Sequence, residues 1–220
     1  MNKNNEMSAK VIVLGDTSVG KSSIIQRYFE NTFDEHLPNT IGAAFQTDNF
    51  FSKDKTKSVK MNVWDTCGQE RFMSIASVYY KDANIILLVI DASQGETLEV
   101  AKKYFEEILN HANADPIVML VVNKVDLLDT TMQLTKVDDN LKKKCSFYSK
   151  IEKFINEKDI EHVFWTSAKE NGINVKEMFH FIGNGILENR FRIKNDPNTA
   201  QKNVIGLSYI GPAKKDKKCC

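Results

Sequence analysis

The sequence predicts an α/β protein with a mostly parallel β-sheet that is covered by helices on both faces. Apolar runs rich in β-branched residues recur at 11–14, 85–90, 117–122 and 162–166 with little polar alternation. Such runs are typical of parallel strands that are buried on both faces. Segments with helical periodicity separate the runs, which indicates repeated βαβ units.

The spacing of apolar residues predicts three helices. The first run is followed by apolar residues at positions 24, 25, 28 and 29, and the run 85–90 by apolar residues at 100, 104, 105 and 108. A third set, at 147, 151, 154 and 155, precedes the last run. Spacings of three and four place each set on one face of a helix, so each helix is expected to pack on the sheet.

Two further runs, 45–51 and 59–64, alternate polar and apolar residues. Alternation is typical of half-exposed strands, and a stretch rich in Lys, Asp and Ser between the two runs favours a turn that pairs them antiparallel. The expected sheet therefore has six strands, of which one is an antiparallel edge strand.

The chain has 220 residues, of which 42% are hydrophobic, and is long enough for one domain with appendages. We expect a flexible N-terminus at 1–8, one folded domain at 9–191 and a flexible tail at 192–220. Residues 190–220 carry eight Lys or Arg against two Asp or Glu, so the remainder has a net charge of −5 within a total of +1. A basic end is typical of proteins that meet an anionic surface, whereas the near-neutral total offers no footprint for nucleic acid.

The cysteines and the apolar runs indicate a cytosolic domain. The longest apolar runs have six residues, far fewer than the roughly 18 that a membrane-spanning helix needs. The first residues lack the apolar stretch of a signal peptide, and Asn2 stands where myristoylation requires glycine. Cysteines at only four positions, 67, 145, 219 and 220, fit neither a disulfide scaffold nor a zinc site.

The string from Gly15 to Ser22, Gly-Asp-Thr-Ser-Val-Gly-Lys-Ser, follows the first strand and precedes the first helix. In this context GxxxxGK(S/T) is a phosphate-binding loop, whose glycines allow backbone N–H groups to converge on a phosphate. Lys21 is expected to bridge the β- and γ-phosphates and to act in catalysis, and the Ser22 hydroxyl to bind Mg²⁺. The expected phosphate-binding residues are Ser18, Val19, Gly20, Lys21, Ser22 and Ser23. This string alone indicates a nucleoside-triphosphatase or a kinase.

A second string, Asp65-Thr-Cys-Gly68-Gln69, ends the run 59–64. A carboxylate at this edge of the sheet is placed to hold Mg²⁺ through water, which we expect of Asp65. Gly68 can offer its N–H to the γ-phosphate, and Gln69 can orient the attacking water as the second catalytic residue. Taken alone, Asp-x-x-Gly is also an ordinary turn at the end of a strand.

A third and a fourth string follow the last two strands, Asn123-Lys124-Val-Asp126 and Ser167-Ala168-Lys169. Asp126 can accept from N1–H and the exocyclic amine of guanine, and adenine lacks this pair of donors. Asn123 is expected to brace the loops or meet N7, Ala168 to donate its N–H to O6, and the Lys124 stem to lie along the base. Each string alone is also compatible with a capped turn.

Four such strings in this order resemble the Ras-like small GTPases and, within them, the Rab family, over about residues 8–190. The resemblance implies a P-loop NTPase fold of the Ras-like G-domain type, with GTP/GDP as substrate and ligand and Mg²⁺ as cofactor. It also implies a monomeric switch that hydrolyses GTP slowly and regulates vesicle traffic.

The resemblance assigns roles to five further residues. Thr40 would join Mg²⁺ only in the triphosphate state, and Phe33 would pack on the edge of guanine. Phe45, Trp64 and Tyr79 would report the state of the switch to effectors. Without the resemblance, we would expect all three aromatic side chains in the core, and this alternative stays open for Phe45 and Trp64.

The C-terminal string Lys214-Lys-Asp-Lys-Lys-Cys219-Cys220 resembles the doubly geranylgeranylated terminus of Rab proteins. One lipid gives marginal attachment, whereas two lipids with basic residues worth about 1 kcal/mol each give stable anchoring. Two idle thiols in a tail are the alternative. The string 40–45 is most like the early-endosomal branch, which implies the cytoplasmic side of endosomal membranes and a cytosolic GDP-bound pool.

The same resemblance implies five kinds of protein partner: an exchange factor, a GTPase-activating protein, a GDP-dissociation inhibitor, an escort protein and effectors.

Three features depart from the family pattern. Cys67 replaces the usual Ala, Thr17 is β-branched near the γ-phosphate, and the chain is longer at 130–144. We expect the basic run Lys142–Lys144 within that segment to lie in a solvated loop, with a partner contact as the alternative. Two other functions stay open, a P-loop kinase or ATPase and a scaffold that binds guanine nucleotides without hydrolysing them.

Overall fold

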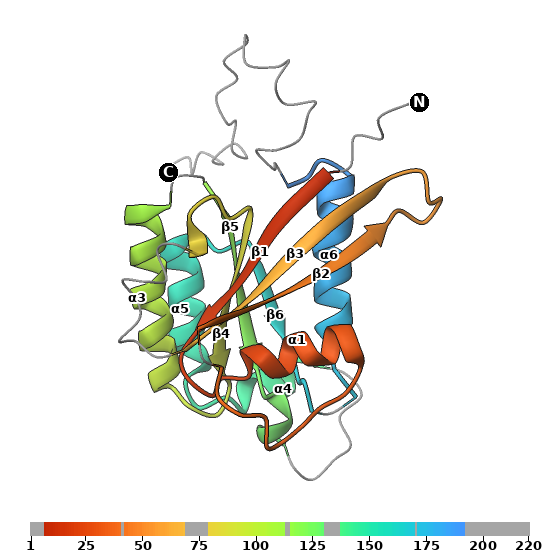
Figure 1. Cartoon of the computed structure of the whole chain (residues 1–220). Helices are drawn as coiled ribbons and strands as arrows, with labels where there is room; N and C mark the ends of the chain where they lie inside the picture. The colour runs from red at the N-terminus through yellow and green to blue at the C-terminus, as the bar shows by residue number, and fades with distance from the viewer. Residues whose placement is uncertain are drawn as a thin grey trace, which may run out of the picture.

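A six-stranded sheet with helices on both faces forms the body of the protein (Figure 1). The computed structural model describes residues 7–40, 42–68, 79–112, 115–129, 137–169 and 171–191. The strands are β1 (Met7–Gly15), β2 (Ala43–Phe51), β3 (Ser58–Thr66), β4 (Ile85–Asp91), β5 (Ile117–Asn123) and β6 (His162–Trp165). The helices are α1 (Lys21–Glu30), α3 (Glu96–His111), α4 (Asp139–Lys143), α5 (Tyr148–Lys158) and α6 (Val175–Leu187), with the short 3₁₀ helix η2 (Val125–Leu127).

The strand order is β2-β3-β1-β4-β5-β6, and β2 and β3 are the antiparallel pair. The other four strand pairs are parallel, so the predicted fold class is confirmed. Five strands consequently end at the same edge of the sheet. The chain leaves β1 between β3 and β4, where the order of strands reverses, and α/β proteins bind ligands at such a switch point.

The central strands are buried on both faces, as their apolar runs predict. In β1, Ile12 and Leu14 belong to the core under α3 and α5, whereas Val11 and Val13 belong to the core under α1 and α6. Figure 1 shows the two pairs of helices on opposite sides of the sheet. This alternation explains why the sequence has no polar residues at these positions.

Two features of the fold differ from the sequence-based expectations. β1 begins at Met7, which pairs with Val59, so residues 7 and 8 belong to the sheet and not to the N-terminal segment. α6 was not expected, although Val175, Met178, Phe179, Ile182 and Ile186 have helical spacing and are buried. None of the described helices is long and apolar enough to cross a membrane.

The segment expected to be a solvated loop contains the helix α4. Asp138 caps it by accepting a hydrogen bond from the Leu141 backbone N–H at 2.9 Å, and the Leu141 side chain is buried in the core under α3 and α5. One apolar anchor and one cap are enough to order a five-residue helix here. Within the basic run, Lys142 pairs with Asp139 and Lys144 pairs with Asp129. Residues 130–136 lie outside the described part of the chain.

Candidate functional site

A pocket of about 360 Å³ lies at the carboxyl edge of the sheet, where the predicted binding strings meet. The predicted residues that line it are Ser18, Gly20, Lys21, Ser22, Ser23, Phe33, Thr40, Gly68, Asn123, Lys124, Asp126, Ala168 and Lys169. Val19, Asp65 and Ser167 lie behind this lining, and each is hydrogen-bonded to a residue that faces the pocket. A pocket of this volume is typical of small-molecule and cofactor sites.

The phosphate loop passes closely under neighbouring strands, and its two glycines are required for that path. Gly20 has φ of 96°, a value that favours glycine, and a side chain there would collide with the Asn123 amide. A side chain on Gly15 would collide with the Val89 carbonyl of β4. The loop leads directly into α1, so the N-terminus of that helix lines the pocket and favours an anion there.

Lys21 is almost completely buried at the start of α1, with 5% of its surface exposed. Its ammonium donates to the carbonyl oxygens of Gly15, at 3.1 Å, and Asp16, at 2.6 Å. Burial lowers the pKa of Lys21 to about 8, and the neighbouring carboxylates of Asp65 and Asp16 offset this effect only in part. A buried cation held by carbonyl dipoles at the start of a helix is suited to contact a phosphate.

This burial predicts proton uptake when GDP binds in mildly alkaline solution. At pH 8.5 part of the free protein has a neutral Lys21, because its pKa is about 8. A diphosphate beside the amine raises this pKa, so GDP binding should protonate Lys21 in that part of the molecules. Affinity should accordingly fall as the pH rises above 8. Titration calorimetry in two buffers of different ionisation enthalpy measures the uptake, and pH 7, where Lys21 is already charged, provides the control. Equal heats in both buffers at pH 8.5 would contradict this prediction.

Two hydroxyl groups and one carboxylate meet beside the phosphate loop. Thr40 Oγ1 donates to Asp65 Oδ2 at 3.2 Å, and Ser22 Oγ lies 2.8 Å from Thr40 Oγ1. The other carboxylate oxygen, Asp65 Oδ1, is buried and has no hydrogen-bond partner among the described residues. Burial raises the pKa of Asp65, although the Ser22 and Thr40 hydroxyls and Lys21 oppose that shift. A buried, incompletely paired carboxylate destabilises the site unless a cation balances it.

These oxygen atoms fit Mg²⁺, which binds few protein ligands and keeps water and phosphate oxygens in its other positions. Within the part of the chain that the structure describes, no group of three or more His, Cys, Asp or Glu could hold a metal ion. Ser22, Thr40 and Asp65 would hold Mg²⁺ together with phosphate oxygens and water.

Gly68 lies three residues after Asp65 and is buried against the phosphate loop. A side chain at Gly68 would collide with the Asp16 carbonyl and the Lys21 ammonium, so only glycine fits. Thr17 and Cys67, the two departures from the family pattern, both line the pocket near this point. Gln69, the predicted water-orienting residue, lies outside the described residues.

The opposite end of the pocket carries the predicted base-binding residues. Asp126 lines the pocket, and its Oδ1 accepts from Ser167 Oγ at 2.5 Å, which orients the carboxylate. Asn123 is buried, donates from Nδ2 to the Val19 carbonyl at 2.9 Å and accepts from Thr166 Oγ1 at 3.1 Å. Asn123 therefore joins the phosphate loop to the ends of β5 and β6. Bracing of the loops was one of the two roles expected for Asn123, and contact with N7 of the base was the other.

The sequence did not identify Arg27 of α1, which holds the loop that contains Ala168. Arg27 Nε donates to the Ala168 carbonyl at 2.7 Å, and Nη2 donates to the Lys169 carbonyl at 3.2 Å. Gly172 allows this contact, because a Cβ there would lie 2.6 Å from Arg27 Cδ. The partners are more than 140 residues apart in the chain, so no local pattern could have revealed them.

The three predicted effector aromatics form a row across β2, β3 and the residues before β4. Ring centroids are 5.1 Å apart for Phe45 and Trp64 and 6.2 Å apart for Trp64 and Tyr79. Trp64 and Tyr79 are partly buried against the core, but Phe45 is 51% exposed and is not a core residue. Cys219 and Cys220, predicted to carry lipid, lie outside the described residues.

Comparison with known proteins identifies the family. The model of the Ras family matches residues 10–188. The chain is 32% identical to the GTP-binding protein ypt5 of Schizosaccharomyces pombe over 97% of this chain and 93% of that protein. It is 35% identical to the GTP-binding protein YPT52 of Saccharomyces cerevisiae over 88% of this chain and 86% of that protein. It is 33% identical to human Ras-related protein Rab-22A over 77% of this chain and 79% of that protein.

The matched region contains all the described residues that line the pocket. Membership of this family favours a hydrolase over the two alternatives that the sequence left open, a P-loop kinase or ATPase and a non-hydrolysing scaffold. The chain therefore belongs to the Ras family and is a Rab-type small GTPase, an enzyme that hydrolyses GTP.

Proposed function

We propose that this GTPase is a Mg²⁺-dependent GTP/GDP switch with slow intrinsic hydrolysis, anchored to membranes by two C-terminal lipids and active in vesicle traffic at endosomes. The observation that carries the switch is the hydrogen-bonded set Ser22, Thr40 and Asp65. It joins the phosphate loop, the segment between α1 and β2, and the end of β3. A nucleotide with a γ-phosphate would bind all three groups, whereas one without it would not. The γ-phosphate would thereby fix the position of the segment between α1 and β2, as a switch requires.

Each end of the pocket has a distinct role in this proposal. Lys21 and the N-terminus of α1 bind the phosphates, and Gly68 offers its N–H to the γ-phosphate. Asp126 accepts the two guanine donors, Ala168 donates to O6, Lys124 and Phe33 flank the base, and Ser167 and Lys169 hold the base loop. Ser22, Thr40 and Asp65, the last through water, would hold Mg²⁺, and the ion would supply positive charge beside the phosphate oxygens. Gln69 orients the water that attacks the γ-phosphorus.

Changing Ser22 to Asn tests the proposed switch. The variant loses the hydroxyl that would bind Mg²⁺, and we expect a larger loss of GTP affinity than of GDP affinity, because the ion contacts the γ-phosphate only in GTP. Ser22→Thr keeps a hydroxyl and serves as the matched control. Equilibrium binding of both fluorescent nucleotides, with and without Mg²⁺, measures the difference. A Ser22→Asn variant with an unchanged ratio of GTP to GDP affinity would rule out this role of Ser22.

The C-terminal string supports the membrane part of the proposal. Cys219 and Cys220 end a segment in which four lysines precede the thiols, and geranylgeranyl groups on both cysteines would supply the two lipids needed for stable anchoring. The relatives with Rab names support trafficking in general. The residues at 40–45 resemble the endosomal branch and support the endosomal location. An exchange factor, an activating protein, effectors, a GDP-dissociation inhibitor and an escort protein complete the proposed cycle of a monomeric switch with a cytosolic GDP-bound pool.

Replacing both cysteines by Ser is expected to release the protein from membranes without changing nucleotide affinity. The cysteines lie about 50 residues beyond the base loop, and one lipid alone is near the threshold of stable binding, so Cys220→Ser alone should give partial attachment. Cys145→Ser, which alters a buried thiol of the folded domain, is the control. Fractionation of cells and the intact mass of the C-terminal peptide are the measurements. A double variant that stays on membranes, or a native peptide without lipid mass, would remove the anchor from the proposal.

A further inference from the structure

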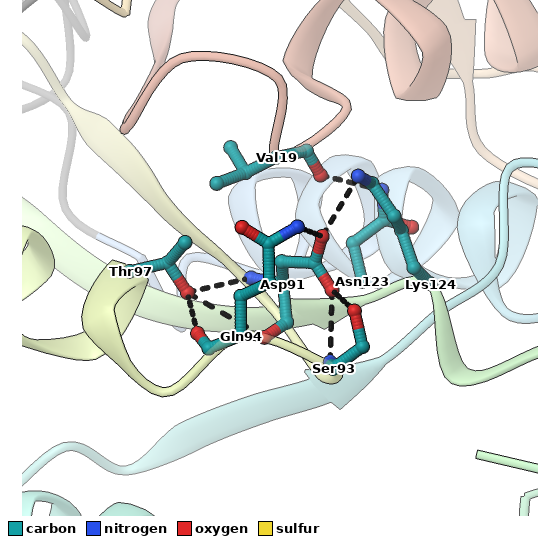
Figure 2. A network of polar contacts seen from close by, with 7 residues as sticks. All are labelled: Val19, Asp91, Ser93, Gln94, Thr97, Asn123 and Lys124. Carbon is teal, nitrogen blue, oxygen red and sulfur yellow. Dashed lines mark hydrogen bonds and ion pairs between the residues drawn. The ribbon is translucent and has the colours of Figure 1, made fainter. Parts of the chain in front are cut away.

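Asp91, at the carboxyl end of β4, is a buried carboxylate that none of the four binding strings contains. Its side chain is 1% exposed and accepts four hydrogen bonds or ion-pair contacts (Figure 2). Oδ1 accepts from the Ser93 backbone N–H at 2.8 Å and from Ser93 Oγ at 2.6 Å. Oδ2 accepts from Gln94 Nε2 at 3.3 Å and from Lys124 Nζ at 2.7 Å. Among the described residues, the charged partner of this carboxylate is Lys124, which lines the base end of the pocket.

Lys124 is held at both ends. Its backbone has φ of 62°, and the residues around it are fixed by hydrogen bonds from the Val125 N–H to the Thr166 carbonyl and from the Leu127 N–H to the Lys124 carbonyl. Its ammonium is fixed by Asp91. The side chain between these points has four rotatable bonds, and an ammonium without this partner would turn toward water in many conformations. The ion pair thus selects one path for the stem.

Asp91 is itself positioned independently of Lys124. Its backbone N–H donates to Thr97 Oγ1 at 3.0 Å, and β4 and β5 place Asp91 directly opposite Asn123. Figure 2 shows the carboxylate between the start of α3 and the residues Asn123 and Lys124. The carboxylate is therefore a fixed point to which the flexible lysine is attached.

We propose that Asp91 is a positioning residue of the nucleotide site, which holds the Lys124 stem against the guanine base and so slows the release of nucleotide. This inference rests on the proposed function, in which Lys124 lies along the base. Asp91 does not contact the nucleotide and acts through Lys124 alone. Ser93 and Gln94 attach the same carboxylate to the turn before α3, so the test has to distinguish the positioning of Lys124 from a purely structural role.

A double-mutant cycle separates the two roles. Asp91→Asn keeps an oxygen that can accept from Ser93 but removes the charge that holds Lys124. Lys124→Met keeps an unbranched apolar stem without the ammonium. We expect each single variant to accelerate the dissociation of fluorescent GDP about tenfold, and the double variant to be no faster than Lys124→Met, because both changes break the same contact. Ser93→Ala removes the hydroxyl that donates to Asp91 Oδ1 but keeps the carboxylate charge and the Oδ2 contact with Lys124, so it should lower the melting temperature and leave the dissociation rate within about twofold of wild type.

An additive cycle, in which Asp91→Asn accelerates release equally with and without the lysine ammonium, would assign Asp91 a structural role and overturn the proposal. An Asp91→Asn variant with the dissociation rate of wild type would do the same. If Asp91→Asn does not fold, Lys124→Met still breaks the ion pair, because the Lys124 side chain is partly exposed and its replacement is better tolerated. A Lys124→Met variant that releases GDP as slowly as the wild type would overturn the proposal. Failure of the wild-type protein to bind GDP tightly would overturn the proposed function as well, whereas tight binding with an additive cycle would overturn only the role of Asp91.

Discussion

Replacing Asp126 by Asn is expected to weaken GTP and GDP binding by a factor on the order of 10⁴ and to transfer the preference to xanthine nucleotides. The carboxylate accepts from the N1–H and the 2-amino group of guanine, and an amide would place a donor against a donor. Xanthine has an oxygen where guanine has the amine, so the new Asn can donate to it. Ser167 orients the side chain at this position in either case, because an amide oxygen can also accept from its hydroxyl.

Competition binding of GDP, xanthosine diphosphate and ADP to wild type and to Asp126→Asn measures the effect. Asp159→Asn makes the same chemical change at an exposed position after α5 and should leave all three affinities unchanged. Wild-type protein that binds adenine and guanine nucleotides equally would contradict the assignment of the base end. Loss of guanine binding without a gain of xanthine binding would indicate a damaged loop and not an exchanged pair of donors.

Replacing Gln69 by Leu is expected to leave nucleotide affinity intact and to abolish most of the acceleration by an activating protein, which for arginine-supplying partners is on the order of 10³ to 10⁵. Gln69 follows Gly68, whose position against Lys21 and the Asp16 carbonyl brings the chain to the phosphate end of the pocket. A leucine there cannot orient water, whereas the groups that bind the nucleotide are unchanged.

Single-turnover release of phosphate, with and without an activating protein, is the measurement. Gln201→Leu makes the same substitution in the C-terminal segment and is the control. An unchanged stimulated rate in Gln69→Leu would mean that another residue orients the water. Cys67 and Thr17 also line this end of the pocket, and the intrinsic rate of a Cys67→Ala variant compared with that of the wild type in the same assay measures the effect of Cys67.

The binding strings could be predicted from the sequence because each is a short, local pattern placed directly after a strand. Parallel strands bring their carboxyl ends to one edge, so the identification of buried runs was enough to collect Gly20, Gly68, Asn123 and Ala168 at one pocket. Arg27 could not be found in this way. Its role depends on a helix and a loop that are distant in the chain, and an arginine on a helix is ordinarily a solvated residue.

Asp91 was also missed, although it ends a strand that the sequence predicts. Its string lacks a recognised pattern, and its partner depends on the register of β4 against β5, which places Asp91 opposite Asn123. The same limit applies to α4, where a single buried leucine and one cap decide between helix and loop. Phe45 shows another limit of the sequence. Alternation predicts that one face of the strand is exposed, but it does not predict which aromatic side chains lie on that face.

The helix α1 begins at the phosphate loop and reaches the base loop through Arg27, so one rigid element spans both ends of the pocket. Lys21 and Arg27 are six residues apart, which at 1.5 Å per residue is about 9 Å along the helix axis. Because a helix cannot be compressed or extended by side-chain rearrangement, the two loops keep a constant separation. The pocket consequently selects ligands by length. A free base or a free phosphate can occupy only one end, and only a molecule that carries both groups at the matching distance can contact the whole site.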